Sequence, residues 1–221
     1  MMITAVQAAA SIAVLMLAGN TGRNMVQTVS ISRNDAASID AGSKIFPELS
    51  SPEAAVDKLQ SLKRKELVQL FTACRAPSDL SEIEGEWNGC LLDNNGLTTI
   101  SNILTHQLFG LRVGRNWNGK AFGGNGKGIN RFTTKERTAT EHVFEYSLQD
   151  SNIVGDSQSV RIDYWNYQSP VSLWKTMRDE VRVIPVTLSD VEVLLGMGSM
   201  GWAGGSNNCA PFCMWRATPK N

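Results

Sequence analysis

The charged side chains that could do chemistry lie in the C-terminal half of the chain. They are Asp163, Arg178, Asp179, Glu180 and Arg182. In an extended strand alternate side chains point to opposite faces, so Arg178, Glu180 and Arg182 share one face. The favoured interpretation is an ion-pair ladder with Asp163 or Arg161 on the outside of a sheet. Facing inward, the same residues would form the floor of a polar pocket, where Glu180 and Asp163 could act as acid and base.

A second set of candidates is mainly aromatic. Trp87 and Trp117 could line a cavity for an apolar ligand, because such cavities have aromatic walls and few polar groups. Packing within the end of a barrel is the favoured alternative for both side chains. Lys120 would need an acid if it pointed inward, and it could then bind a ligand carboxylate, but the favoured position is the surface. The ligand-binding candidates are completed by Phe122, Tyr164 and Met197.

Patterns for catalysis, metal binding and nucleotide binding are missing from the sequence. No Ser/His/Asp arrangement with a nucleophile elbow is found. The glycine-rich segment 123–128 lacks the Lys-Ser or Lys-Thr of a phosphate-binding loop, and it predicts a flexible hairpin. The two histidines, His106 and His142, have no ligand spacing to the cysteines. We therefore predict no catalytic residue, no metal site and no cofactor.

The four cysteines are Cys74, Cys90, Cys209 and Cys213. We interpret them as small buried apolar side chains, the usual environment of a free cysteine. An oxidising compartment would permit one or two disulfides, and the sequence does not choose among the three possible pairings.

Overall composition indicates an ordinary folded domain. The chain has 221 residues, with 21 basic and 21 acidic side chains and 42% hydrophobic residues. Balanced charge gives no indication of nucleic acid as a partner. The 6 tryptophans and 19 glycines lie mostly after residue 84, and glycine turns between aromatic strands are typical of a curved sheet.

The first 44 residues resemble targeting sequence. Residues 3–19 are almost free of charge, and their most apolar part has the length of a signal-peptide core. Residues 20–44 are rich in Ser, Asn, Ala and Thr, as in a transit peptide. The prediction for 1–44 is a leader for a plastid, with secretion or the endomembrane lumen as the alternative location. A disordered N-terminus would also explain this composition.

A helical segment is expected over residues 45–81. Ser51-Pro52-Glu53 has the composition of a helix start, and apolar residues recur at three- and four-residue steps as far as Cys74. The pattern predicts one amphipathic helix over 51–74. Its basic run Lys63-Arg64-Lys65 is expected to be exposed to solvent on the polar face.

The remaining residues, 82–221, predict a mainly β domain. Alternating runs separated by turn residues predict about eight strands, at 83–92, 117–122, 129–132, 141–148, 160–167, 177–186, 191–200 and 210–216. An antiparallel sheet with this number of strands tends to close, because closure removes its edges. The segment 97–109 has helical spacing and is expected to form a short helix across one end of the barrel.

This ordered set of motifs resembles the small calycin-like (lipocalin-type) barrels. More narrowly, it is similar to the family named for its Gly-x-Trp-x-Gly motif and the domain that often follows it, over roughly residues 82–217. The matching motifs are Gly85-Glu86-Trp87-Asn88-Gly89, Trp117-Asn118-Gly119-Lys120-Ala121-Phe122, Met177-Arg178-Asp179-Glu180, Leu195-Gly196-Met197-Gly198 and Ala210-Pro211-Phe212. The resemblance implies a barrel for a hydrophobic ligand and supplies no catalytic residue. A looser similarity connects the chain to the plastid lipid-associated (fibrillin) proteins.

Three functions follow as hypotheses. The first is a non-enzymatic binding protein for an apolar small molecule, such as a pigment, an isoprenoid or a fatty acid. The second is an auxiliary or assembly subunit that docks on a larger photosynthetic membrane complex, because apolar residues gather near the C-terminus. The third is a pigment lyase or isomerase, which would need a titratable residue in the cavity, with Glu180, Asp163 and Lys120 as candidates.

Overall fold

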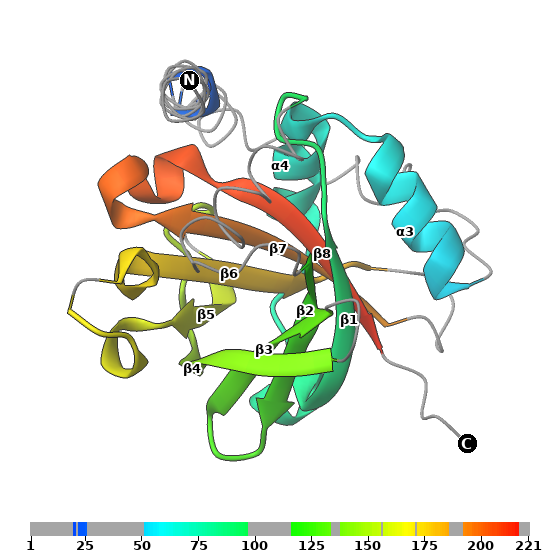
Figure 1. The fold of residues 1–221 in the computed structure, drawn as a ribbon. Helices are drawn as coiled ribbons and strands as arrows, with labels where there is room; N and C mark the ends of the chain where they lie inside the picture. Colours follow the sequence, from blue (N-terminus) through cyan, green and yellow to red (C-terminus); the bar gives the residue numbers. More distant parts are fainter. Residues whose placement is uncertain are drawn as a thin grey trace, which may run out of the picture.

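The barrel expected from the sequence is present. A computed structural model describes residues 20, 22–25, 51–96, 116–133, 138–155, 157–170, 172–185 and 192–216. Eight antiparallel strands follow one another around a closed barrel, and the last strand pairs with the first (Figure 1). This confirms the mainly β fold, and an eight-stranded antiparallel barrel is consistent with a calycin-like fold. The short helix expected at 97–109 lies outside the described residues.

Each strand falls in or close to its predicted range. The strands are β1 (Gly85–Leu91), β2 (Asn116–Gly123), β3 (Lys127–Thr133), β4 (Thr138–Asp150), β5 (Gln158–Asp163), β6 (Met177–Val183), β7 (Val193–Met200) and β8 (Ala210–Arg216). The glycine-rich segment forms the tight turn between β2 and β3, as predicted for a hairpin. Its Gly126 has a φ of 72°, which favours glycine.

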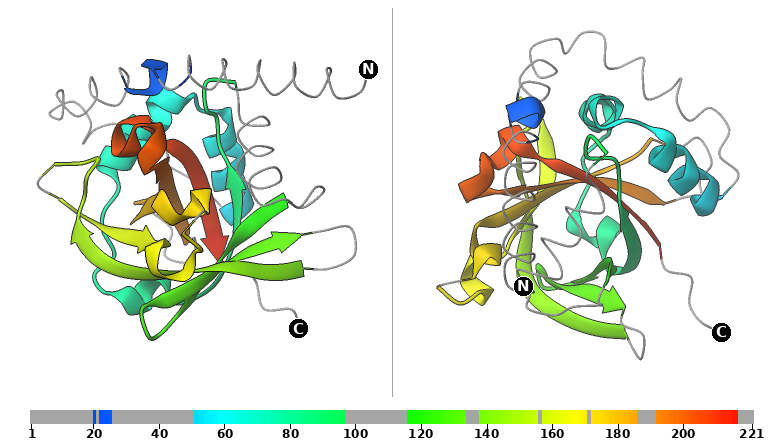
Figure 2. Two further views of the ribbon diagram at one scale, coloured as in Figure 1. Left: turned by 60° about the vertical axis from the view of Figure 1, so that its left-hand side comes forward. Right: turned by 45° about the horizontal axis from the view of Figure 1, so that its top comes forward.

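Two apolar clusters lie on opposite faces of the barrel wall. Aromatic and branched side chains fill the interior, among them Trp87, Phe132, Phe144, Ile162 and Phe212. A second cluster lies outside, where the helices pack on the outer faces of β7 and β8. Figure 2 shows both helices on one side of the barrel. Strand alternation therefore produces two cores, since part of the outer face is also covered.

The predicted single helix over 51–74 is wrong, because the chain forms two helices, α3 (Pro52–Ser61) and α4 (Arg64–Ala73). The start is as predicted, with the Ser51 hydroxyl accepting a hydrogen bond from the Ala54 amide at 3.2 Å. The break falls at Leu62 and Lys63, which are both extended. The amide of Lys63 donates to Glu66 Oε2 at 2.7 Å, which caps the new helix start.

Tertiary contacts of Arg64 explain the break. Its amide donates to Asp93 Oδ2 at 3.0 Å, and its guanidinium donates to the carbonyl of Cys209 at 2.9 and 3.1 Å. Arg64 is therefore buried, contrary to the solvent-exposed position expected for it.

In the part of the chain that the structure describes, no helix has both the length and the apolar character needed to cross a membrane.

A short piece of the predicted leader contacts the barrel domain. Asn24 is buried and donates to Asn94 Oδ1 at 3.0 Å and to Asn208 Oδ1 at 2.8 Å. Its own amide oxygen accepts from Asn95, which also donates to Asn20 at 3.1 Å. Figure 2 shows this segment beside the loop that follows β7. A leader that ended at residue 44 would remove these contacts.

The two tryptophan motifs of the sequence interlock where β1 pairs with β2. A Cβ on Gly89 would lie 2.7 Å from the Trp117 ring, and one on Gly119 would lie 1.9 Å from the Trp87 carbonyl. Gly119 also has a φ of 136°, and the strand pairing shifts between Trp117 and Gly119. Glycine is required at both places because the two strands approach too closely for a side chain.

We predict that Gly119→Ala destabilises the protein by about 3 kcal/mol, because it combines overpacking with left-handed strain. The control is Gly205→Ala, since Gly205 has a φ of 58° but nothing within 4 Å of its Cβ position. That variant should lose only about 1 kcal/mol from strain. Urea unfolding of the three proteins measures the difference, and equal losses would show that the close strand approach does not matter.

Candidate functional site

A buried ion pair crosses the interior of the barrel. Lys120 on β2 and Asp179 on β6 lie 2.8 Å apart between Nζ and Oδ2, with 2% and 1% of their side chains exposed. The expected surface position of Lys120 is therefore wrong. The shift in pairing after Trp117 turns Lys120 and Phe122 into the barrel, and Asp179 supplies the acid that an inward lysine needs.

Three acceptors use all three N–H groups of the Lys120 ammonium. Besides Asp179, it donates to Asn130 Oδ1 at 2.8 Å and to the Tyr164 hydroxyl at 2.6 Å. Tyr164 in turn donates to Asp179 Oδ2 at 3.0 Å. Trp117 Nε1 donates to the same Asn130 oxygen at 3.0 Å. The result is a hydrogen-bonded network that links residues on β2, β3 and β6 with Tyr164, which directly follows β5.

Aromatic rings surround the ammonium group. Lys120 Nζ lies 5.2–5.6 Å from the ring centroids of four residues, Trp117, Phe144, Tyr164 and Phe212. Each ring face attracts a cation, so this cage partly offsets the loss of water. Burial nevertheless lowers the pKa of Lys120, and the Asp179 carboxylate opposes that change. Burial, followed by the charge of Asp179, holds the pKa of Tyr164 well above its ordinary value.

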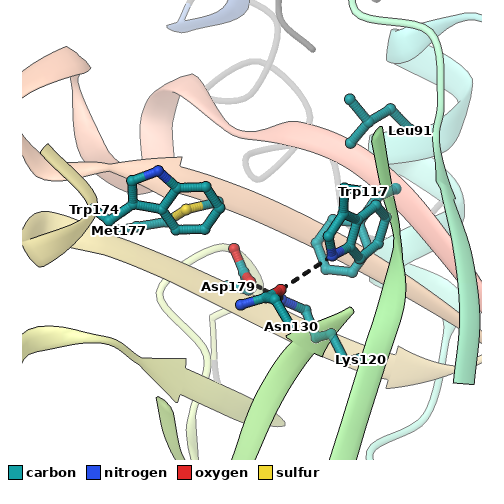
Figure 3. Close-up of a pocket in the computed structure, with 8 residues that line it drawn as sticks. Leu91, Trp117, Lys120, Asn130, Trp174, Met177 and Asp179 are labelled. Atoms are coloured by element: carbon teal, nitrogen blue, oxygen red, sulfur yellow. Dashed lines mark hydrogen bonds and ion pairs between the residues drawn. The ribbon is translucent and has the colours of Figure 1, made fainter. Parts of the chain in front are cut away.

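A small cavity of about 30 Å³ adjoins this network. Its lining residues are Leu91, Trp117, Lys120, Asn130, Trp174, Met177, Asp179 and Phe212. Figure 3 shows the Asp179 carboxylate between Trp174 and Met177 on one side and Trp117 on the other. Within the described part of the chain, Asp179 Oδ1 is buried and has no hydrogen-bond partner. The cavity therefore offers one charged acceptor among apolar walls.

The other predicted binding residues inside the barrel have packing contacts. Trp87 lies at one end of the barrel, where its Nε1 donates to the Ile83 carbonyl at 2.8 Å. The Arg216 guanidinium covers its ring at 4.2 Å from the centroid. Phe122 contacts Phe144 edge to face, with their centroids 5.5 Å apart. Neither Trp87 nor Phe122 lines the cavity, whereas Trp117 and Lys120 do.

The remaining predicted site residues lie outside the barrel. Arg178 and Arg161 each lie 2.9 Å from a carboxylate oxygen of Asp163, which confirms the expected outer ladder for these three residues but not for Glu180 and Arg182. Glu180 faces outward as well, and Met197 belongs to the outer core beneath the helices. These residues therefore do not form a pocket floor.

Two of these outward residues hold neighbouring loops and helices. Glu180 accepts from the Asn152 amide at 2.8 Å and from the Ser159 hydroxyl at 2.9 Å. Arg182 donates to the carbonyls of Phe71 and Thr72 at 3.2 and 3.3 Å, at the end of α4. Both roles are structural, because they satisfy backbone groups at a helix end and a loop.

Sequence reasoning missed Asn130, Trp174 and Phe212, and it named Asp179 among the candidate charges without assigning it to the binding site. A signal for Asp179 was present, since this acid shares a strand face with Val181 and Val183. A lone charge on an apolar strand face needs a partner of opposite charge. Lys120 is also a lone charge, because it shares its strand face with Phe122. Matching Lys120 with Asp179 would have predicted the ion pair.

Among the residues that the structure describes, no group of three or more His, Cys, Asp or Glu side chains could hold a metal ion. Comparisons with protein-family models, with curated proteins and with solved structures found no match. The similarity to the Gly-x-Trp-x-Gly family and to the fibrillins thus stays a prediction from the motifs.

All four cysteines are free thiols, and three of them are buried, as expected. Cys90 and Cys213 face each other across β1 and β8, with 3.5 Å between their sulfur atoms. The hydrogen bond from Cys213 lowers the pKa of Cys90 to about 7. Burial raises the pKa of Cys74 to about 12. Cys90 is therefore the thiol that ionises near neutral pH.

We predict that iodoacetamide alkylates Cys90 first and that its rate rises with pH through a midpoint of about 7, because the thiolate is the nucleophile. Peptide mapping by mass spectrometry measures the rate at each site. In Cys213→Ala the donor is lost, so the midpoint should move upward. A wild-type midpoint at about 8.5, the value of a free thiol, would contradict the prediction.

For the ion pair we predict that Lys120→Met costs about 3–5 kcal/mol, because it leaves the Asp179 charge buried without its partner. The double variant Lys120→Met/Asp179→Asn removes the isolated charge and should be more stable than Lys120→Met alone. Urea unfolding of the wild type, both single variants and the double variant completes the cycle. Additive losses would show that the two side chains are not coupled.

Proposed function

We propose that the protein is a non-enzymatic binding protein for an apolar small molecule, such as a pigment, an isoprenoid or a fatty acid. The observation that supports this is the cavity within the closed barrel. Five apolar side chains line it, Leu91, Trp117, Trp174, Met177 and Phe212, together with only three polar residues. Apolar walls with a few fixed polar groups are typical of small-molecule sites.

The cavity's volume limits how such a ligand binds. About 30 Å³ is room for roughly two water-sized groups, whereas sites for drug-sized ligands measure about 300–1,000 Å³. A chain or ring system therefore needs the cavity to widen. Leu91 and Met177 are only half-buried, so these two side chains can move with less loss of packing than the buried rings.

The motif resemblance and the leader extend the proposal. We propose that the barrel belongs with the Gly-x-Trp-x-Gly proteins, and the close approach of β1 and β2 at Gly89 and Gly119 supports a structural role for the motif glycines. The similarity to the fibrillins and the composition of residues 1–44 favour a plastid, with secretion or the endomembrane lumen as the alternative. Both points rest on sequence motifs.

The auxiliary-subunit function is the second candidate, because two tryptophans are exposed on the surface. Trp165 is 57% exposed and Trp202 is 48% exposed. Exposed indole rings are common in protein interfaces. The lyase or isomerase has less support, since Lys120 alone of its three candidate residues lines the cavity. All N–H groups of that ammonium are already donated.

Mass spectrometry of an organic-solvent extract tests the proposal. The protein purified from its native source should yield one lipid or pigment in a stoichiometric amount. Met177→Trp should reduce that amount by filling the cavity, which Met177 lines, whereas a tryptophan at the outward-facing Ser199 (Ser199→Trp) should not. An empty wild-type protein that co-purifies with a membrane complex would contradict binding and support the auxiliary subunit.

A further inference from the structure

We infer that the ligand presents a hydroxyl or N–H donor, and not a carboxylate, to Asp179. This inference rests on the proposed binding function and selects among its ligand classes. The two charged residues of the cavity select the head group of the ligand. Every N–H group of Lys120 is already donated, whereas Asp179 Oδ1 accepts no hydrogen bond from the described residues. Alcohols, amines and amides with an apolar body are thus favoured over fatty acids.

Lys120 cannot bind a ligand carboxylate in this arrangement. An ammonium has three N–H donors, and here they reach Asp179 at 2.8 Å, Asn130 at 2.8 Å and Tyr164 at 2.6 Å. A carboxylate would have to displace one of these buried acceptors. The displaced group would then lose its hydrogen bond without reaching water, which is unfavourable for a buried polar group.

Asp179, in contrast to Lys120, can still accept a hydrogen bond from a ligand. Its Oδ2 accepts from Lys120 and Tyr164, while Oδ1 is buried without a partner among the described residues. Asp179 pairs with Gly198 on β7, and a Cβ there would lie 3.0 Å from Oδ1. The carboxylate can lie this close to β7 because Gly198 has no side chain. A buried carboxylate oxygen gains most from a donor, since charge-assisted hydrogen bonds are the strong ones.

Charge and size agree with a small donor group. Lys120 and Asp179 neutralise each other, so a ligand carboxylate would place a second negative charge beside Oδ1 with no cation left to balance it. The space of about 30 Å³ fits a hydroxyl or amino group together with the first carbon of a chain. The apolar remainder would extend past Trp174 toward the half-buried Met177.

Matched ligands on the wild-type protein test the inference. Dodecan-1-ol, 1-methoxydodecane and dodecanoate share one chain and differ in the head group. Each is titrated at pH 8 against bound N-phenyl-1-naphthylamine, a neutral fluorescent apolar probe. We expect the alcohol to displace the probe at a concentration at least tenfold lower than either of the others. The alcohol supplies a donor, while the ether has none and the carboxylate is repelled.

The outcomes separate this inference from the proposed function. If dodecanoate or the ether competes as well as the alcohol, the donor requirement is wrong and the binding function stands. If the probe and all three ligands fail to bind, the binding function is wrong. Asp179→Asn adds a second readout, because loss of the charge should remove the preference for alcohol over carboxylate. The wild-type comparison remains decisive even where that variant does not fold.

Discussion

The ion pair between Lys120 and Asp179 is the interaction on which the interior of the barrel depends. Two opposite charges are removed from water there, and their mutual attraction alone rarely compensates for that loss. The structure adds hydrogen bonds from or to Asn130 and Tyr164 and a cage of aromatic rings. These contacts join strands from different parts of the barrel, so the pair also fixes how those strands face one another.

The pair in turn requires close packing of the first two strands. Gly89 makes room for the ring of Trp117, and Gly119 lets β2 approach the backbone of Trp87. The same irregularity at Trp117 and Gly119 turns Lys120 inward. The two short tryptophan motifs therefore act as one structural unit, which places a charge inside an otherwise apolar barrel.

The inner and outer faces of the barrel wall carry charged residues with different roles. Inside, Asp179 Oδ1 lies beside a small cavity with apolar walls and has no hydrogen-bond partner in the described part of the chain. Outside, Glu180 and Arg182 hold loops and the end of α4, and Asp163 joins Arg178 and Arg161 in a ladder. The strand β6 thus carries the candidate binding residue on one face and structural contacts on the other.

The sequence alone predicted about eight strands, the hairpin after β2 and, as the favoured alternative, ion pairs of Asp163 on the outer face. These features follow from alternation within a strand and from turn residues, which act over a few neighbouring positions. Tertiary structure decided the position of Lys120, the break before Arg64 and the identity of the binding residue. Lys120 turns inward because of an irregularity in the pairing of β2 with β3, and α4 starts where Asp93 and Cys209 accept hydrogen bonds from Arg64. Such contacts join distant parts of the chain, and local periodicity holds no information about which residues will meet.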